Sequence, residues 1–150
     1  MVTRAAIDDF LAHKELALAG VSRSGQGFGN LARKELAAKG YALHLVHPTA
    51  EAIAGQPCVH HLTELAHPVD GLLLVTPPEE TERLVEEAHA AGIRRVWMQQ
   101  GAESEAAIRY CEEHGMEVIH HQCVLMFAGH PGWVHRAHRW AKGLVGRLPS

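Results

Sequence analysis

Cysteine is scarce in this chain of 150 residues, and long hydrophobic runs are missing. The three cysteines, Cys58, Cys111 and Cys123, are odd in number and scattered, so we expect no disulfide framework. No apolar run approaches the roughly 20 residues that a membrane-spanning helix needs, and the first residues show no signal-peptide core. These absences favour a protein of the reducing cytoplasm.

Strong charge of either sign is also lacking. The formal net charge is -3 at pH 7, which gives no reason to expect nucleic acid or an anionic membrane as a partner. The hydrophobic share of 47% and the charged share of 21% are ordinary for a globular protein. A chain of this length can bury one substantial core, so we expect residues 1–150 to form a single domain.

What the chain does contain is an alternation of short apolar runs with segments of helical spacing. The apolar runs predict strands over residues 16–21, 41–46, 58–60, 71–75, 95–99 and 117–120. Helical segments are expected over 3–13, 31–39, 63–66, 78–91, 104–114 and 131–147. This order predicts an α/β fold of the Rossmann-like, doubly wound type, with three layers around a mainly parallel sheet.

Polar residues and glycines mark the ends of the expected helices. Thr3 and Ser104 suit N-caps, and Gly40 suits the position just after a helix. Asn30 is the predicted N-cap of the helix that follows the first strand. The inward face of that helix is predicted to hold Leu31, Leu36 and Ala37.

A glycine-rich loop over residues 20–29 follows the first strand. Its start, Gly20-Val21-Ser22-Arg23-Ser24-Gly25, carries serine at the second glycine of the Gly-x-Gly-x-x-Gly fingerprint. The second strand ends in His47-Pro48, where a dinucleotide site needs a ribose-binding acid. Both departures point away from NAD and FAD and leave phosphate binding intact, because Ser22 offers a hydroxyl and Arg23 a positive charge. The alternative is a tight turn whose glycines serve only its geometry.

The other loops at the same sheet edge are the remaining candidates for ligand contact. In a parallel sheet, ligands bind outside the carboxyl ends of the strands, where strand order reverses. The loops expected at this edge are 20–29, 47–48, 76–78, 99–101 and 121–123.

These loops resemble those of a known family. The segments Ala17-x-x-Gly20-Val21-Ser22, Val46-His47-Pro48 and Trp97-Met98-Gln99-x-Gly101 are similar to motifs of the CoA-binding domain family. Ile53-x-Gly55, Val69-Asp70 and Cys123 resemble it too, so the likeness covers about residues 4–128. Domains of this family occur alone as small bacterial proteins and as the first domain of the succinyl-CoA synthetase alpha subunit.

The resemblance implies a Rossmann-like fold that holds coenzyme A across the strand ends. By matching position, Gly20, Ser22 and Arg23 would meet the phosphates, and Val46 and Pro48 would lie beside the adenine. Thr76 and Pro77 would line the next stretch, while Gln99 and Gly101 would border the pantetheine or substrate end. The full set of candidate CoA-binding residues is Gly20, Val21, Ser22, Arg23, Ser24, Gly29, Val46, His47, Pro48, Thr76, Pro77, Pro78, Gln99, Gln100, Gly101 and Cys123.

The sequence departs from the family pattern at two places. His47 stands where asparagine is usual, which bears on the adenosine contact. His121-Gln122 precedes Cys123 where Asp-Arg or a similar pair is common, which bears on any chemistry at the thiol end.

Catalytic and metal sites find little support in the residue pattern. Gly129-His130-Pro131-Gly132 resembles the phosphohistidine loop of the synthetases, but there the loop lies in a second domain; the alternative is a helix that Pro131 opens. The pairs His60-His61 and His120-His121 lie near cysteines, yet neighbours on a strand point to opposite faces, so we expect no metal site. On an extended chain His121 and Cys123 would share a face. Cys123 could therefore be a reactive thiol, and the alternative is a buried structural cysteine.

The predicted helix over 131–147 is amphipathic. Its apolar side is predicted to carry Trp133, Ala137, Trp140, Leu144 and Leu148, with basic residues elsewhere. Such a helix is typical of the outer layer of a fold, and its tryptophans could also form a self-association surface.

The sequence as a whole predicts a protein that binds CoA or an acyl-CoA and catalyses no reaction alone. The alternatives are an NAD(P)-binding oxidoreductase, a ligase subunit, and a regulatory module that senses redox state through Cys123. A homo-oligomer or a partner enzyme stays open.

Overall fold

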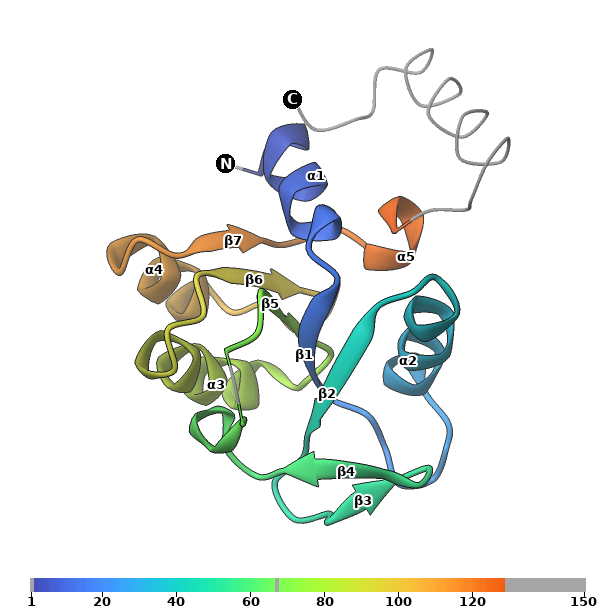
Figure 1. Cartoon of the computed structure of the whole chain (residues 1–150). Coiled ribbons are helices and arrows are strands. Elements are labelled where there is room, and N and C mark those ends of the chain that lie inside the picture. The colour runs from blue at the N-terminus through green and yellow to red at the C-terminus, as the bar shows by residue number, and fades with distance from the viewer. Residues whose placement is uncertain (1, 67, 129–150) are drawn as a thin grey trace, which may run out of the picture.

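The apolar runs of the sequence form one sheet in the computed structural model, which describes residues 2–66 and 68–128. Within these residues the strands are β1 (Glu15–Ala19), β2 (Ala42–Val46), β3 (Ala52–Ile53), β4 (Gln56–Val59), β5 (Gly71–Leu74), β6 (Arg95–Met98) and β7 (Glu117–Ile119). Their order is β3-β4-β2-β1-β5-β6-β7, and every pairing is parallel except β3–β4 (Figure 1). The predicted Rossmann-like α/β fold is confirmed.

Helices cover both faces of this sheet. They are α1 (Arg4–Ala12), α2 (Phe28–Ala38), the 3-10 turn η1 (Leu62–Glu64), α3 (Pro78–Ala90), α4 (Glu105–Glu113) and α5 (Val124–Phe127). Residues of α1, α2 and α5 belong to one buried cluster, and residues of η1, α3 and α4 belong to the other. The described chain therefore has three layers, with the sheet in the middle (Figure 1).

The alternation of side chains along β1 shows how the sheet divides the core. Leu16 and Leu18 point into the α1–α2 side, whereas Ala17 and Ala19 point into the α3 side. All four are buried, as expected for a central parallel strand. Trp97 of β6 is fully buried and meets the ring of Phe10 edge-on, with 5.3 Å between the ring centroids.

The predicted caps of two helices are present. Thr3 accepts a hydrogen bond from the amide of Ala6, and Ser104 accepts one from the amide of Ala107. Gly40 follows α2 with a φ of +92°, as a helix-ending glycine should.

The start of α2 differs from the prediction. The helix begins at Phe28 with Gly27 as its N-cap, so Asn30 lies inside it and is not a cap. The predicted inward face is wrong for two residues, because Leu31 is 47% exposed and Ala37 is also exposed, while Leu36 is buried as expected. The buried face consists of Gly29, Asn30, Ala32 and Leu36.

Two short elements were not predicted. β3 pairs with β4 through a hairpin in which Ala54 and Gly55 both have positive φ, the conformation that a tight two-residue turn requires. α5 is a single turn after β7. The predicted helix over 131–147 and the motif Gly129-His130-Pro131-Gly132 lie outside the described residues.

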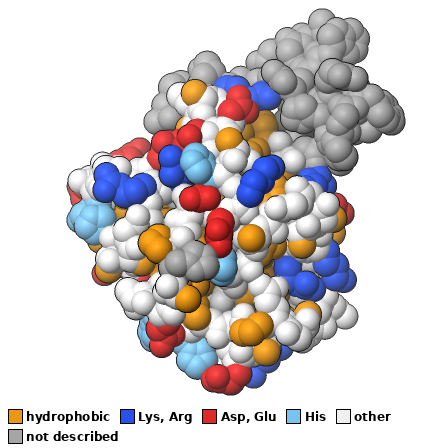
Figure 2. Space-filling model, viewed as in Figure 1, with side chains coloured by type: hydrophobic (Ala, Val, Ile, Leu, Met, Phe, Trp, Pro, Cys, Tyr) orange, Lys and Arg blue, Asp and Glu red, His pale blue; other side chains and the backbone are white. Residues whose placement is uncertain are grey.

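The surface carries mixed charge. Figure 2 shows acidic, basic and histidine side chains interspersed over most of the face in view, in agreement with the small net charge. In the part of the chain that the structure describes, no helix is long and apolar enough to cross a membrane.

Candidate functional site

A pocket of about 380 Å³ opens at the carboxyl ends of β1, β2 and β5. The chain passes from β1 to β2 on one side and later adds β5 on the other, so strand order reverses here. Nine predicted site residues line this pocket together: Gly20, Val21, Ser22, Arg23, Val46, His47, Pro48, Thr76 and Pro77. Ala19, Val75, Glu80, Arg83 and Leu84 complete the lining.

Seven predicted site residues do not line it. Ser24 lies on the rim of the glycine loop, Gly29 is buried beneath that loop, and Pro78 is the first residue of α3. The other four, Gln99, Gln100, Gly101 and Cys123, follow β6 and β7 at the same edge of the sheet.

Two glycines allow backbone to meet backbone at the base of the loop. A Cβ on Gly20 would lie 2.1 Å from the carbonyl oxygen of Val75, and the φ of Gly20 is +108°. A Cβ on Gly29 would lie 2.2 Å from the carbonyl oxygen of Gly20. The loop is therefore wedged between the end of β5 and the first turn of α2, and neither position can take a side chain without movement of the main chain.

Two serines organise the exposed part of the loop. The Oγ of Ser22 accepts a hydrogen bond from the amide of Ser24 (3.1 Å), and the Oγ of Ser24 accepts one from the amide of Gln26 (3.2 Å). The two hydroxyls are 2.8 Å apart and share a hydrogen bond. Because only one hydroxyl hydrogen is used between them, the other remains available to a ligand.

Asn30 holds the same loop from below. Its side chain is only 2% exposed, and its Nδ2 donates to the carbonyls of Ser22 (3.0 Å) and Gln26 (2.8 Å). One amide group thus closes the loop onto α2. Asparagine is a common N-cap, so the sequence favoured the wrong role, and no local pattern reveals this contact.

The two arginines of the pocket differ in how their charge is balanced. The Nη2 of Arg23 donates to the neutral Oγ1 of Thr49 (2.6 Å), and among the described residues no carboxylate lies within ion-pair distance of Arg23. Arg83 pairs with both Glu80 and Glu87 of its own helix. Arg23 is therefore the guanidinium that an anion can use without displacing a carboxylate.

The pKa of Arg83 reflects its pairing. Burial acts to lower this pKa, but the hydrogen bond to Glu80 and the negative charges of Glu87 and Glu80 outweigh burial and raise it. Glu80 and Arg83 were not predicted as site residues, because their place beside the pocket depends on how α3 packs.

His47 forms a turn at the end of β2. Its Nδ1 accepts hydrogen bonds from the amides of Thr49 (3.1 Å) and Ala50 (2.9 Å). Burial and the positive charge of Arg23 lower the pKa of this histidine, and the charge of Glu80 opposes them. The ring thus caps the turn as an asparagine side chain does in an Asx-turn.

The residues after β6 anchor the segment that follows β7. Gln99 is 5% exposed, and its Oε1 accepts a hydrogen bond from the amide of Val124 (2.9 Å). The indole Nε1 of Trp97 donates to the carbonyl of Gln122 (3.0 Å). These two side chains fix Cys123, the half-buried N-cap residue of α5.

The predicted geometry of His120, His121 and Cys123 is wrong. His121 has a φ of +60°, so the chain is not extended there and the argument that His121 and Cys123 share a face fails. The rings of His120 and His121 do not point to opposite faces, because their Nδ1 atoms lie 2.7 Å apart. Across residues 2–66 and 68–128, no group of three or more histidine, cysteine or acidic side chains could hold a metal ion.

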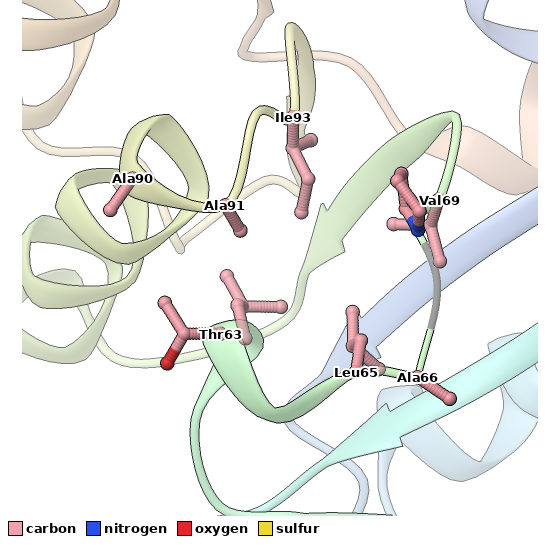
Figure 3. Close-up of a pocket in the computed structure, with 9 residues that line it drawn as sticks. Thr63, Leu65, Ala66, Val69, Ala90, Ala91 and Ile93 are labelled. Carbon is pink, nitrogen blue, oxygen red and sulfur yellow. The ribbon is translucent and has the colours of Figure 1, made fainter.

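A second pocket, of about 230 Å³, lies at the other end of β5. In Figure 3, Leu65 points from one side of the pocket toward the space below Ala91 and Ile93. Its lining residues are Leu62, Thr63, Leu65, Ala66, Pro68, Val69, Ala90, Ala91 and Ile93. None of the described residues that line it is charged, and it adjoins the carboxyl end of α3, whose dipole repels anions. This pocket does not suit a phosphate.

Comparisons with known proteins show which family the chain resembles. The family described as CoA binding domain matches residues 14–128. The uncharacterized protein YneT of Bacillus subtilis (strain 168) is 27% identical over 111 residues, which are 74% of this chain and 82% of YneT.

Solved structures share the fold. A conserved hypothetical protein from Pyrococcus furiosus has a TM-score of 0.71 and 34% identity, over 75% of this chain and 97% of that one. An acetyl-coenzyme A synthetase of Ca. Korarchaeum cryptofilum has a TM-score of 0.62 over 70% of this chain and 25% of the synthetase. The identity to the synthetase is 20%, so this match shows a shared fold only. Because the family match spans most of its length, the chain belongs to the CoA binding domain family.

Proposed function

We propose that this protein binds coenzyme A or an acyl-CoA in the pocket at the ends of β1, β2 and β5. The observation that carries the proposal is Arg23, a pocket guanidinium of the glycine-rich loop with no carboxylate partner among the described residues. A phosphate group suits this combination of a planar cation and a serine hydroxyl in a loop that leads into the N-terminus of α2.

Each part of the ligand has matching chemistry at the sheet edge. The phosphates would meet the loop at Ser22 and Arg23, close to the first turn of α2. The adenine would lie against Val46 and Pro48, which line the pocket at the end of β2. The pantetheine would run toward Gln99–Gly101 and Cys123, which follow the next strands of the sheet. The remaining predicted contacts lie in the loops after β1, β5 and β6 or in the first turns of α2 and α3: Val21, Ser24, Gly29, Thr76, Pro77, Pro78 and Gln100.

NAD is a poorer fit to this pocket. A dinucleotide site uses a carboxylate at the end of the second strand to hold the ribose hydroxyls, and His47 stands there. Glu80 is the carboxylate that lines the pocket among the described residues, and it is engaged by Arg83. Glu80 belongs to α3, however, and not to the end of the second strand where a dinucleotide site holds the ribose.

The protein is proposed to act by binding alone, with any chemistry supplied by a partner enzyme or a second copy. It is proposed to be a single domain and to work in the reducing cytoplasm. A site for redox sensing would need Cys123 to respond to the ligand. Alkylation of Cys123 with iodoacetamide tests this directly: an unchanged CoA affinity would place the thiol outside the ligand's reach.

Isothermal titration calorimetry with CoA, acetyl-CoA, NAD and NADP tests the proposal. We expect CoA to bind more tightly than NAD, and Arg23→Ala to weaken CoA about tenfold or more, because a hydrogen-bonded charge contact is worth about 1.5–3 kcal/mol. Arg109→Ala is the matched control, since Arg109 is exposed on α4 away from the pocket. Tighter binding of NAD than of CoA, or equal losses in the two variants, would overturn the proposal.

A further inference from the structure

His47 departs from the family pattern and lies in the proposed site, which makes its second ring nitrogen informative. Nδ1 accepts hydrogen bonds from two backbone amides, those of Thr49 and Ala50. An imidazole nitrogen that accepts cannot carry a hydrogen, so the ring hydrogen must sit on Nε2. The turn therefore fixes one tautomer of a neutral histidine.

The Nε2–H group of this tautomer is the part of the ring that the turn leaves free for a ligand. His47 lines the pocket with Arg23, and no partner for Nε2 is found among the described residues. The charged and titratable groups around the ring are Arg23, Glu80 and His60. Arg23 is in turn held by Thr49, a residue of the turn that His47 caps. The guanidinium of Arg23 and the imidazole of His47 are thus both positioned by the turn over residues 47–50.

We propose that His47 is a specificity-determining residue that donates Nε2–H, as a neutral ring, to a phosphate oxygen of the nucleotide ligand beside Arg23. This inference rests on the proposed function. A guanidinium and a neutral N–H donor that line one pocket are complementary to an oxyanion. Arg23 supplies the positive charge, and His47 supplies a hydrogen bond of fixed orientation. The 3′-phosphate and the pyrophosphate of CoA share this chemistry.

The fixed tautomer gives the site an unusual pH dependence. An imidazole that merely approached a phosphate would bind it better when protonated, so affinity would rise in acid. Here a proton on Nδ1 would face the amide hydrogens of Thr49 and Ala50 and break the turn that positions Arg23. Affinity should therefore fall on acidification. The pKa of His47 is lowered by burial and by Arg23, which favours the neutral ring near neutral pH.

A matched pair of variants separates the cap from the donor. In His47→Asn the side-chain oxygen can accept from the same two amides, as in an Asx-turn, but the shorter side chain cannot place a donor where Nε2 lies. In His47→Ala both functions are lost. The Asn variant should keep the thermal unfolding midpoint of the wild type, which makes a change in affinity interpretable.

Calorimetry of CoA and 3′-dephospho-CoA at about pH 7.5 and about pH 5.5 tests the inference. At the higher pH we expect His47→Asn to bind CoA about tenfold more weakly than the wild type, the loss expected for one hydrogen bond to a charged group. Acidification should weaken the wild type more than His47→Asn. The ligand's own phosphate titration is common to both proteins and cancels in this comparison.

The outcomes are separable. A loss in His47→Asn that disappears with 3′-dephospho-CoA supports the inference with the 3′-phosphate as acceptor, and a loss that persists supports it with the pyrophosphate. Equal affinity and equal pH profiles in the wild type and His47→Asn overturn the inference and leave the proposed function standing. Wild-type affinity that rises in acid overturns it as well. If the wild type binds no CoA at all, both the inference and the proposed function fail.

Discussion

The substitution Gly29→Ala tests the packing of the glycine loop, because helix propensity and sterics predict opposite signs. Gly29 lies in the first turn of α2 and is buried. On propensity alone, alanine in place of glycine stabilises a helix by about 1 kcal/mol. The new Cβ would lie 2.2 Å from the carbonyl oxygen of Gly20, however, well inside the 3.0 Å below which real contacts essentially never fall.

The magnitude follows from what has to move. The obstructing atom is backbone, so α2 and the loop must separate by about 0.8 Å, the difference between 3.0 and 2.2 Å. Overpacking of this kind costs about 1–3 kcal/mol. After the gain in propensity, we expect Gly29→Ala to lower the free energy of unfolding by up to about 2 kcal/mol. The same shift displaces Ser22 and Arg23, so CoA affinity should fall at least about tenfold.

Gly40→Ala is the control at the other end of α2. Gly40 has a φ of +92° with nothing within 4 Å of a new Cβ, so the cost there is backbone strain without a clash. We expect a loss of about 1 kcal/mol in stability and an unchanged CoA affinity. Urea denaturation and calorimetry measure both quantities. A Gly29→Ala protein that is as stable as the wild type and binds CoA as tightly would refute the packing argument.

Three further perturbations test other contacts. Asn30→Leu removes both hydrogen bonds to the loop carbonyls at similar side-chain volume. We expect the free energy of unfolding, measured in urea, to fall by about 1–3 kcal/mol and CoA to bind more weakly. Stability equal to that of the wild type would contradict the role of Asn30. Gln99→Leu leaves the amide of Val124 buried without an acceptor, which should lower the free energy of unfolding by about 1–3 kcal/mol. CoA affinity should be less affected than stability. A larger effect on affinity than on stability would count against a mainly anchoring role. Burial raises the pKa of the Cys111 thiol to about 12. In the folded protein, iodoacetamide at about pH 8 should therefore modify Cys111 last of the three cysteines. Peptide mapping that finds Cys111 modified first would show that this thiol is not buried.

The strands could be predicted because each is a short apolar run bounded by polar or glycine residues. Leu16 and Leu73 are buried in their strands as such runs predict. Knowing that the strands are parallel was enough to predict that the loops after β1, β2 and β5 meet at one edge. That argument covers the loops that hold eight of the nine predicted residues sharing the pocket, and the family resemblance added Val46.

What could not be predicted depends on contacts between distant segments. Asn30 sits where a cap would be reasonable, and only the path of the loop brings the carbonyls of Ser22 and Gln26 to its amide. Glu80 and Arg83 reach the pocket through the rotation of α3 against the sheet. The positive φ of His121 has no signal in the residues around it, so the extended geometry assumed there was wrong.

The Trp-x-Gln-x-Gly segment has a structural role that the sequence did not predict. Gln99 and Gly101 were expected at the pantetheine end of the ligand. In the structure Gln99 accepts from Val124 and Trp97 donates to Gln122, so both side chains are used to hold the start of α5. The backbone of Gly101 donates to Glu103 (2.7 Å). A direct contact of these residues with a ligand stays a prediction.

A crystal structure of the protein grown with CoA tests the central claim most directly. We expect the phosphates to lie against the amides and side chains of residues 20–29, with the guanidinium of Arg23 and the Nε2 of His47 within hydrogen-bond distance of phosphate oxygens. CoA bound elsewhere, or electron density for NAD and not for CoA in this pocket when both are supplied, would contradict it.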